Sequence, residues 1–216
     1  MTGFKTGELI AQPGTEILAE GASASQLFTA LHGMGLRYKL LQDGSRQVVG
    51  FILPGDFIGL QNGVMGEMKH SVEATTRMTL CVFNRSELWD LFRNQPQRAF
   101  GLTHIAASEE FVLGEMLAAV GRMEGLTKVA WLLNRFFTRL TALGLNENDR
   151  VPLPYRQQDI ADAMGLSLVH TNKTLAKLRR AGIVTWADDG LTVHRPDQLA
   201  EHAVSVGKEI PSRPLI

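Results

Sequence analysis

Cysteine is almost absent from this chain of 216 residues, because Cys81 is the only one. A single cysteine excludes an intrachain disulfide, and it excludes an iron–sulfur cluster held by several cysteines of one chain. The surrounding residues 80–83 are apolar and predict a buried strand, in which cysteine acts as a small hydrophobic residue. We therefore expect no redox or metal chemistry at this position.

Long hydrophobic runs are also missing. No apolar stretch approaches the ~20 residues that span a membrane, and the N-terminal MTGFKTGELI lacks the apolar core of a signal peptide. Hydrophobic residues still make up 44% of the chain, which is typical of a globular protein. We expect a cytoplasmic protein with no membrane partner, and the length favours two small domains over one.

Catalytic motifs are equally scarce. A cupin-type barrel enzyme would need closely spaced histidines for its metal, but no H-x-H or H-x₃-H spacing occurs. The six histidines are His32, His70, His104, His170, His194 and His202. No nucleophile elbow, phosphate-binding loop or paired-carboxylate motif is present either. The sequence therefore predicts a protein that is not an enzyme, with a cupin-like enzyme as the alternative from a different class.

The most informative segment present is residues 154–183, which predicts a helix, a tight turn and a second helix. Apolar residues recur at helical spacing on both sides of Gly165, and Ser167 is placed to cap the second helix. Cations but no acidic residue occur across His170–Gly182. Such a helix suits the major groove of DNA, whereas the alternative is a helical hairpin that only packs.

A predicted hairpin follows directly, with strands at Ile183–Trp186 and Leu191–Val193 around the turn Asp188–Gly190. A hairpin after a recognition helix makes a winged helix-turn-helix. The net charge is zero, but residues 1–124 carry 10 Lys/Arg against 13 Asp/Glu, whereas residues 125–216 carry 12 against 9. The basic excess thus lies in the half that holds the helix-turn-helix, as DNA binding requires.

The first half of the chain predicts short strands separated by glycines, which is typical of a barrel or jelly roll. A long helix is predicted from about Gln97 to Met123. Seven of its residues recur at steps of four and three: Leu102, Ala106, Glu109, Leu113, Met116, Val120 and Met123. This stripe is either the seam of a two-helix dimer or a surface that packs on the roll. A bend is predicted at Glu124–Thr127, with Gly125 as the weak point in the helix.

These motifs resemble one family. The segment DIADAMGLSLVHTNKTLAKLRRAGIV, residues 159–184, is similar to the C-terminal domain of the Crp/Fnr transcription regulators. FILPGDFIGL at residues 51–60 and HSVEATT at residues 70–76 resemble a hairpin and the next strand of their sensor domain. The resemblance covers about residues 4–200, and its separate motifs occur in the same order as in the family. The single cysteine excludes the cluster of the Fnr type.

The resemblance implies an α+β fold with four parts. These are a double-stranded β-helix (jelly-roll) sensor domain at 1–97, a dimerisation helix at 98–124, a winged helix-turn-helix at 125–197, and a C-terminal helix and tail at 198–216. It also implies a homodimer that binds an inverted-repeat promoter site in double-stranded DNA and contacts RNA polymerase. Dimerisation through the long helix then becomes the preferred reading of the heptad stripe.

The resemblance places the base-contacting positions of the family at Leu168, Val169, Asn172 and Lys173. The cyclic-AMP receptor protein has arginine, glutamate, glycine and arginine there, so the chain departs at each position. Lys173 can still donate to guanine, Asn172 can read adenine, and Val169 can pack on a thymine methyl group. His170 can reach a base or a phosphate. We expect the remaining contacts, to phosphates, from Gln157, Ser167, Thr171 and Lys177.

The effector pocket implied by the resemblance lies around Gly59, Leu60, His70 and Ser71. In the cAMP-binding members a glutamate accepts from the ribose and an arginine before a serine clamps the phosphate. Leu60 and His70 stand at these two positions, and neither supplies that chemistry. We therefore expect an effector other than cAMP, or none. Haem held by His32, His70 or His104 and a cyclic nucleotide partly held by Lys69 are the open alternatives.

Overall fold

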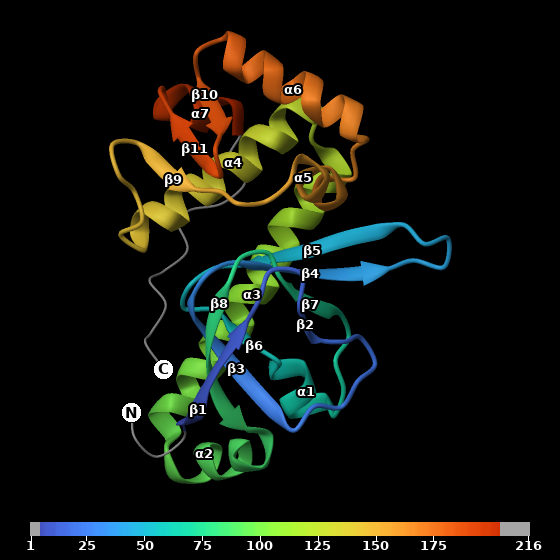
Figure 1. Cartoon of the computed structure of the whole chain (residues 1–216), viewed down its shortest axis with the longest axis vertical. Coiled ribbons are helices and arrows are strands. Elements are labelled where there is room, and N and C mark those ends of the chain that lie inside the picture. The colour runs from blue at the N-terminus through green and yellow to red at the C-terminus, as the bar shows by residue number, and fades with distance from the viewer. Residues whose placement is uncertain (1–4, 204–216) are drawn as a thin grey trace. The chain divides into compact units, whose positions relative to one another are not determined.

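The computed structural model describes residues 5–203 (Figure 1). Strands and helices are both abundant, and the predicted α+β class is confirmed. The chain divides into two compact units, one ending at Val112 and the other beginning at Leu113. Within residues 5–203 no helix is long and apolar enough to cross a membrane.

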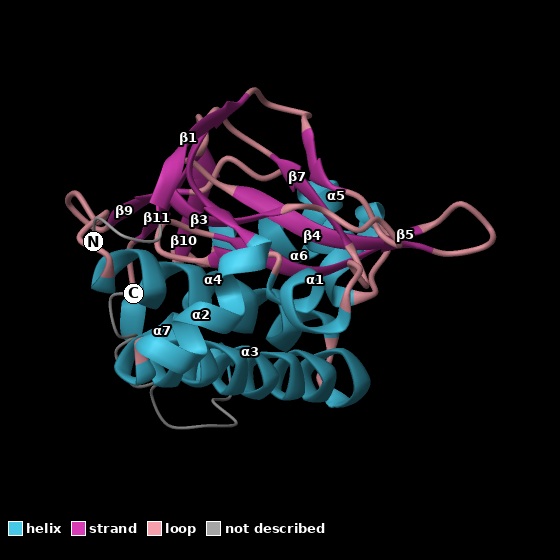
Figure 2. Cartoon of the chain, turned by 90° about the horizontal axis from the view of Figure 1, so that it is seen from below, coloured by secondary structure: helices cyan, strands magenta, loops and turns pink. Residues whose placement is uncertain are grey.

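The described part of the first unit contains two four-stranded antiparallel sheets, drawn in magenta in Figure 2. One has the strand order β1-β8-β3-β6 and the other β2-β7-β4-β5. The strands are β1 (Lys5–Ala11), β2 (Glu16–Leu18), β3 (Gln26–His32), β4 (Gly35–Leu40), β5 (Arg46–Ile52), β6 (Phe57–Ile58), β7 (Ser71–Ala74) and β8 (Met78–Asn84). Neighbours in each sheet are often distant in sequence, as in a jelly roll.

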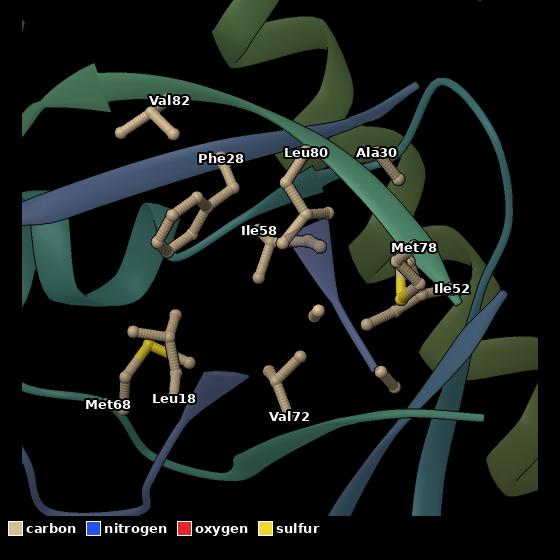
Figure 3. Close-up of a cluster of buried hydrophobic side chains, with 12 residues drawn as sticks. Leu18, Phe28, Ala30, Ile52, Ile58, Met68, Val72, Met78, Leu80 and Val82 are labelled. Atoms are coloured by element: carbon tan, nitrogen blue, oxygen red, sulfur yellow. The ribbon is translucent and has the colours of Figure 1, made fainter. Parts of the chain in front are cut away.

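Apolar side chains from both sheets meet inside this roll (Figure 3). Phe28, Leu80 and Val82 point from the first sheet toward Leu18 and Val72. Each is at most 6% exposed. The alternation of inward apolar and outward polar residues along the strands produces this filling. The interior of the sensor roll is therefore occupied by its own side chains.

Three helices complete the first unit and lead out of it. They are α1 (Leu60–Met65), α2 (Leu88–Asn94), which follows a short 3₁₀ turn at Arg85–Glu87, and α3 (Pro96–Arg122). A second apolar cluster joins Leu102 and Ile105 of α3 to α2 and to β3, β6 and β8. Leu102 is only 1% exposed. The prediction that Leu102 belongs to a dimer seam is therefore wrong, because the roll already buries it.

Glu109, a second member of the predicted stripe, also contacts the roll and not a dimer partner. Its carboxylate Oε1 lies 2.9 Å from Nη2 of Arg37 on β4, and the two side chains are 26% and 14% exposed. The same Arg37 Nη2 donates to the carbonyl oxygen of Phe57 at 2.8 Å. Glu109 is therefore an ion-pair partner of the roll, which explains why a carboxylate interrupts an otherwise apolar stripe.

The second unit begins within α3 and continues through α4 (Gly125–Ala142), β9 (Arg150–Pro152), α5 (Gln157–Met164), α6 (Leu168–Arg180), β10 (Val184–Ala187), β11 (Gly190–Val193) and α7 (Pro196–Ala203). The three strands pair antiparallel in the order β10-β11-β9, and α7 packs on α4. Glu124 is extended, with ψ 159°, so α3 and α4 are separate helices as predicted. The predicted tail at Gly207–Ile216 lies outside the described residues.

Candidate nucleic-acid interface and effector site

The helix-turn-helix has the predicted construction. Gly165 ends α5 in the left-handed conformation, with φ 63°, which glycine adopts at little cost. Ser167 precedes α6, and its hydroxyl accepts a hydrogen bond from the backbone N–H of His170 at 3.2 Å. The predicted cap is therefore confirmed, and it fixes where the recognition helix begins.

Helix α6 has one buried and one exposed face. Thr171, Thr174, Leu175 and Leu178 face the interior of the unit. Most of the residues predicted to meet DNA are exposed here: Ser167, Leu168, Val169, His170, Asn172, Lys173 and Lys177. Arg179 and Arg180, near the end of the helix, are exposed as well. Gln157 at the start of α5 is also exposed. Val169 is 63% exposed and the adjacent Leu168 39%, so the helix start presents two neighbouring apolar side chains to solvent.

Thr171 does not fit the prediction. It is 0% exposed, and its hydroxyl has no hydrogen-bond partner within the described residues. The expected phosphate contact from its side chain is therefore wrong, because Thr171, four residues after Ser167, lies on the same helical stripe as Leu175 and Leu178 and is turned inward.

The wing differs in charge from the recognition helix. Asp188 and Asp189, with φ 49° and 55°, form an exposed tight turn between β10 and β11. The guanidinium of Arg150 on β9 donates to the carbonyl oxygens of Ala187 and Asp188, both at 3.0 Å. This turn presents two carboxylates, which repel phosphate. The cationic surface for DNA is therefore on α6 and not at the tip of the wing.

Sequence reasoning missed Arg156, the residue before α5. Its side chain is 68% exposed, and Nη2 lies 3.3 Å from the carboxylate of the buried Asp159. The backbone N–H of Arg156 also donates to Asp159 at 2.8 Å, so the carboxylate closes the first turn of α5. The sequence signal that could have revealed this arrangement is Asp159, an acidic residue at the third position of the helix. Its pairing with Arg156 holds a further cation beside Gln157.

The four residues predicted to line an effector pocket fall into two pairs, Gly59 and Leu60 beside apolar side chains and His70 and Ser71 at the start of β7. Gly59 has φ 95°, and a Cβ on it would lie 3.3 Å from side-chain atoms of Leu18 and Leu27, so only glycine fits well. Leu60 packs against the second apolar cluster, the one that contains Leu102. A leucine used in this way is a core residue and offers no acceptor to a ribose.

Ser71 begins β7 of the other sheet, and His70 directly precedes it. Burial lowers the pKa of His70 to about 4, helped by the nearby cations Arg37 and Lys39. The imidazole is therefore neutral at pH 7 and carries no charge for a phosphate. The hydroxyl of Ser71 accepts from the backbone N–H of Glu20 at 3.0 Å. Neither residue replaces the phosphate clamp of a cyclic-nucleotide site.

Metal ligation has little support in the described part of the chain. Residues 5–203 contain no group of three or more His, Cys, Asp or Glu side chains that could hold a metal ion. His32 is exposed at the end of β3, while Nδ1 of His104 lies 3.4 Å from the hydroxyl of Ser108. Cys81 is buried in β8 as predicted, and burial raises the pKa of its thiol. Its thiolate is thus disfavoured.

A β-roll unit followed by a winged helix-turn-helix with a cationic reading face defines a class, that of DNA-binding transcription regulators. Comparison with known proteins agrees. Residues 8–95 match the family of the cyclic nucleotide-binding domain, and residues 127–202 match the Crp-like helix-turn-helix domain. The chain belongs to the Crp/Fnr family of transcription regulators.

Three comparisons illustrate this membership. The chain is similar to the nitrogen fixation regulation protein FixK of Bradyrhizobium diazoefficiens, with 33% identity over 85% of this chain and 76% of the relative. It is 32% identical to the transcriptional activatory protein AadR of Rhodopseudomonas palustris over the same shares. The structure of FixK2 from Bradyrhizobium japonicum has 26% identity and a TM-score of 0.84, covering 93% of this chain and 98% of FixK2.

Proposed function

We propose that this regulator binds an inverted-repeat promoter site as a homodimer and places one α6 in the major groove of each half-site. The observation that carries the proposal is the division of α6 into a buried apolar face and an exposed face rich in cations. The exposed residues at the helix start would face base edges, and the cations further along would face phosphates.

Individual contacts follow from the chemistry of each exposed side chain. Lys173 would donate to guanine, Asn172 would read adenine, and Leu168 and Val169 would pack on thymine methyl groups. Gln157, Ser167 and Lys177 would hold phosphates and set the register of the protein on the duplex. Arg156 joins this second group because it is exposed directly beside Gln157.

The dimer would form along the side of α3 that the roll leaves uncovered. Phe100, Ala107, Gly114 and Gly121 recur at steps of seven on this side, and all are exposed. A Cβ on Gly114 or Gly121 would meet no atom within 4 Å. Small residues at heptad spacing allow a second helix to approach closely. Three large apolar side chains flank this track and would pack across it: Phe111 is 43% exposed, Leu113 51% and Leu117 73%.

The sensor roll would respond to a ligand other than a cyclic nucleotide, or to none. Its interior is packed with apolar side chains, Leu60 and Ser71 are engaged within the protein, and His70 is neutral at pH 7. In calorimetric titrations we expect cAMP and cGMP to give no heat of binding. Micromolar binding of either nucleotide would contradict this part of the proposal. Activity in the cytoplasm and contact with RNA polymerase belong to the same proposal, as do the domain limits at residues 97, 124 and 197.

Selection of sites from a random pool of duplexes tests the main proposal. We expect an inverted repeat whose half-sites lie about one helical turn apart, and a dimer by sedimentation. Lys173→Ala should weaken specific binding and relax the choice at one G·C pair by about 1–3 kcal/mol. Lys177→Ala should weaken binding to all sequences alike and lower the salt dependence. A monomer at micromolar concentration, or equal losses of specific and random binding in both variants, would overturn this assignment.

A further inference from the structure

The imidazole of His170 lies against the junction between α3 and α4. Gly125 is the first residue of α4, and a Cβ placed on it would overlap the Nε2 atom of His170. The Cδ2 and Cε1 atoms of the same ring would lie at 2.9 and 3.1 Å from that Cβ. All three nearest atoms belong to one ring, and the backbone of Gly125 does not have positive φ. Gly125 is therefore needed for close approach to His170.

One further contact joins the same junction to the turn of the helix-turn-helix. Nζ of Lys128, in the first turn of α4, donates to the carbonyl oxygen of Met164, the last residue of α5, at 3.3 Å. A cation on the terminal carbonyl of a helix is favourable. The turn that presents α6 is thus held by the start of α4.

All of these residues belong to the second unit, which includes α3 from Leu113 onward. Through His170, the start of α6 therefore contacts Gly125, three residues beyond the end of α3, the helix proposed to lie in the dimer. The distance between two recognition helices then depends on this attachment, since the symmetry axis of the dimer runs beside α3.

We propose that His170 is a positioning residue, which packs on Gly125 to fix α6 relative to α3 and so sets the half-site spacing that the dimer accepts. This inference rests on the proposed function. It also assigns His170 a role different from the base or phosphate contact expected from the sequence. His170 is exposed to solvent, but the Nε2 atom of its ring is directed at Gly125.

Gly125→Ala is the sharpest probe of this contact. The three atoms nearest to the added methyl group all belong to the His170 ring, which can rotate away, so the fold should persist while the contact is lost. We expect Gly125→Ala, His170→Ala and the double variant to lose the same amount of spacing discrimination, about three- to tenfold between the selected spacer and one shorter or longer by one base pair. Base preference within each half-site should be unchanged.

The measurement is fluorescence anisotropy with duplexes that vary either the spacer or one half-site base. His202→Ala, an exposed histidine on α7, is the matched control and should behave as wild type. His170→Asn gives a second variant if the alanine variants lose their circular dichroism signal. Additive losses, unchanged spacer discrimination, or altered preference at a single base pair would each overturn the inference. Absence of specific binding by the wild type would instead refute the proposed function.

Discussion

The ion pair between Arg37 and Glu109 provides a quantitative test of how the roll holds α3. The two groups are 2.9 Å apart and mostly buried, and within the described residues Glu109 Oε1 accepts no hydrogen bond of good geometry. The attraction is therefore chiefly ionic. Glu109→Gln removes the charge while keeping the shape of the side chain, and Arg37→Met removes the other charge while keeping most of the apolar stem.

Removing one partner of a fully buried pair costs about 3–5 kcal/mol, because the other charge is left unpaired. Here the side chains retain 14% and 26% exposure, and Arg37 keeps its bond to the carbonyl oxygen of Phe57. We therefore expect each single variant to lower the free energy of unfolding by about 2 kcal/mol. The double variant should lose no more than either single one, because it leaves no unpaired charge.

Urea unfolding followed by circular dichroism measures these free energies. The matched control is Glu8→Gln, which breaks the pair Lys5–Glu8, whose side chains are 39% and 50% exposed. Solvent screens that pair, so the control should leave the midpoint unchanged. If the losses at Arg37 and Glu109 simply add in the double variant, the two residues act independently and the reasoning is refuted.

Three further measurements follow from the structure. Burial lowers the pKa of His70 to about 4 from an ordinary value of 6.5, so as the pH falls the unfolded chain takes up this proton before the folded chain does. The stability of the fold should therefore be full above pH 6.5 and fall by roughly 3 kcal/mol between pH 6.5 and 4, and His70→Asn should abolish this loss. Leu80→Ala, in the filled interior of the roll, should cost about 2–5 kcal/mol in urea unfolding, whereas a loss below ~1 kcal/mol would show that the roll is loosely packed. Ser167→Ala should cost about 1 kcal/mol by removing the cap of α6 and should weaken DNA binding, while full retention of both would show that the cap is dispensable.

Local signals in the sequence were sufficient for most of the second unit. Gly165, Ser167 and the spacing of apolar residues located the turn, the cap and the recognition helix to within a residue or two. These features depend on backbone conformation and on hydrogen bonds between neighbours in sequence, which local patterns encode well. The strand β9 had no such signal, because three residues pair only through a distant hairpin.

Side-chain direction was harder to predict. Thr171 precedes the buried Leu175 and Leu178 by four and seven residues, so the helical spacing marks it as inward, although its polar side chain favoured a contact to DNA. The spacing of the stripe on α3 predicted a dimer seam, but Leu102 and Glu109 contact the roll, because the first half of the helix has a tertiary partner that the spacing does not reveal. The exposed face with Phe100, Gly114 and Gly121 lacks a continuous apolar stripe and so carried no signal.

Helix α3 begins in the first unit and ends in the second. Glu109 binds Arg37 within the roll unit, and Lys128, just after the end of α3, donates to the last carbonyl before the turn of the helix-turn-helix within the other unit. The interior of the roll is packed with apolar side chains, and the covalent continuity of α3 is a physical route by which a change in the roll could reach the second unit. A signal acting on this regulator should therefore break or strengthen a contact along α3, and loss of the Arg37–Glu109 pair is the event that the structure makes most accessible to measurement.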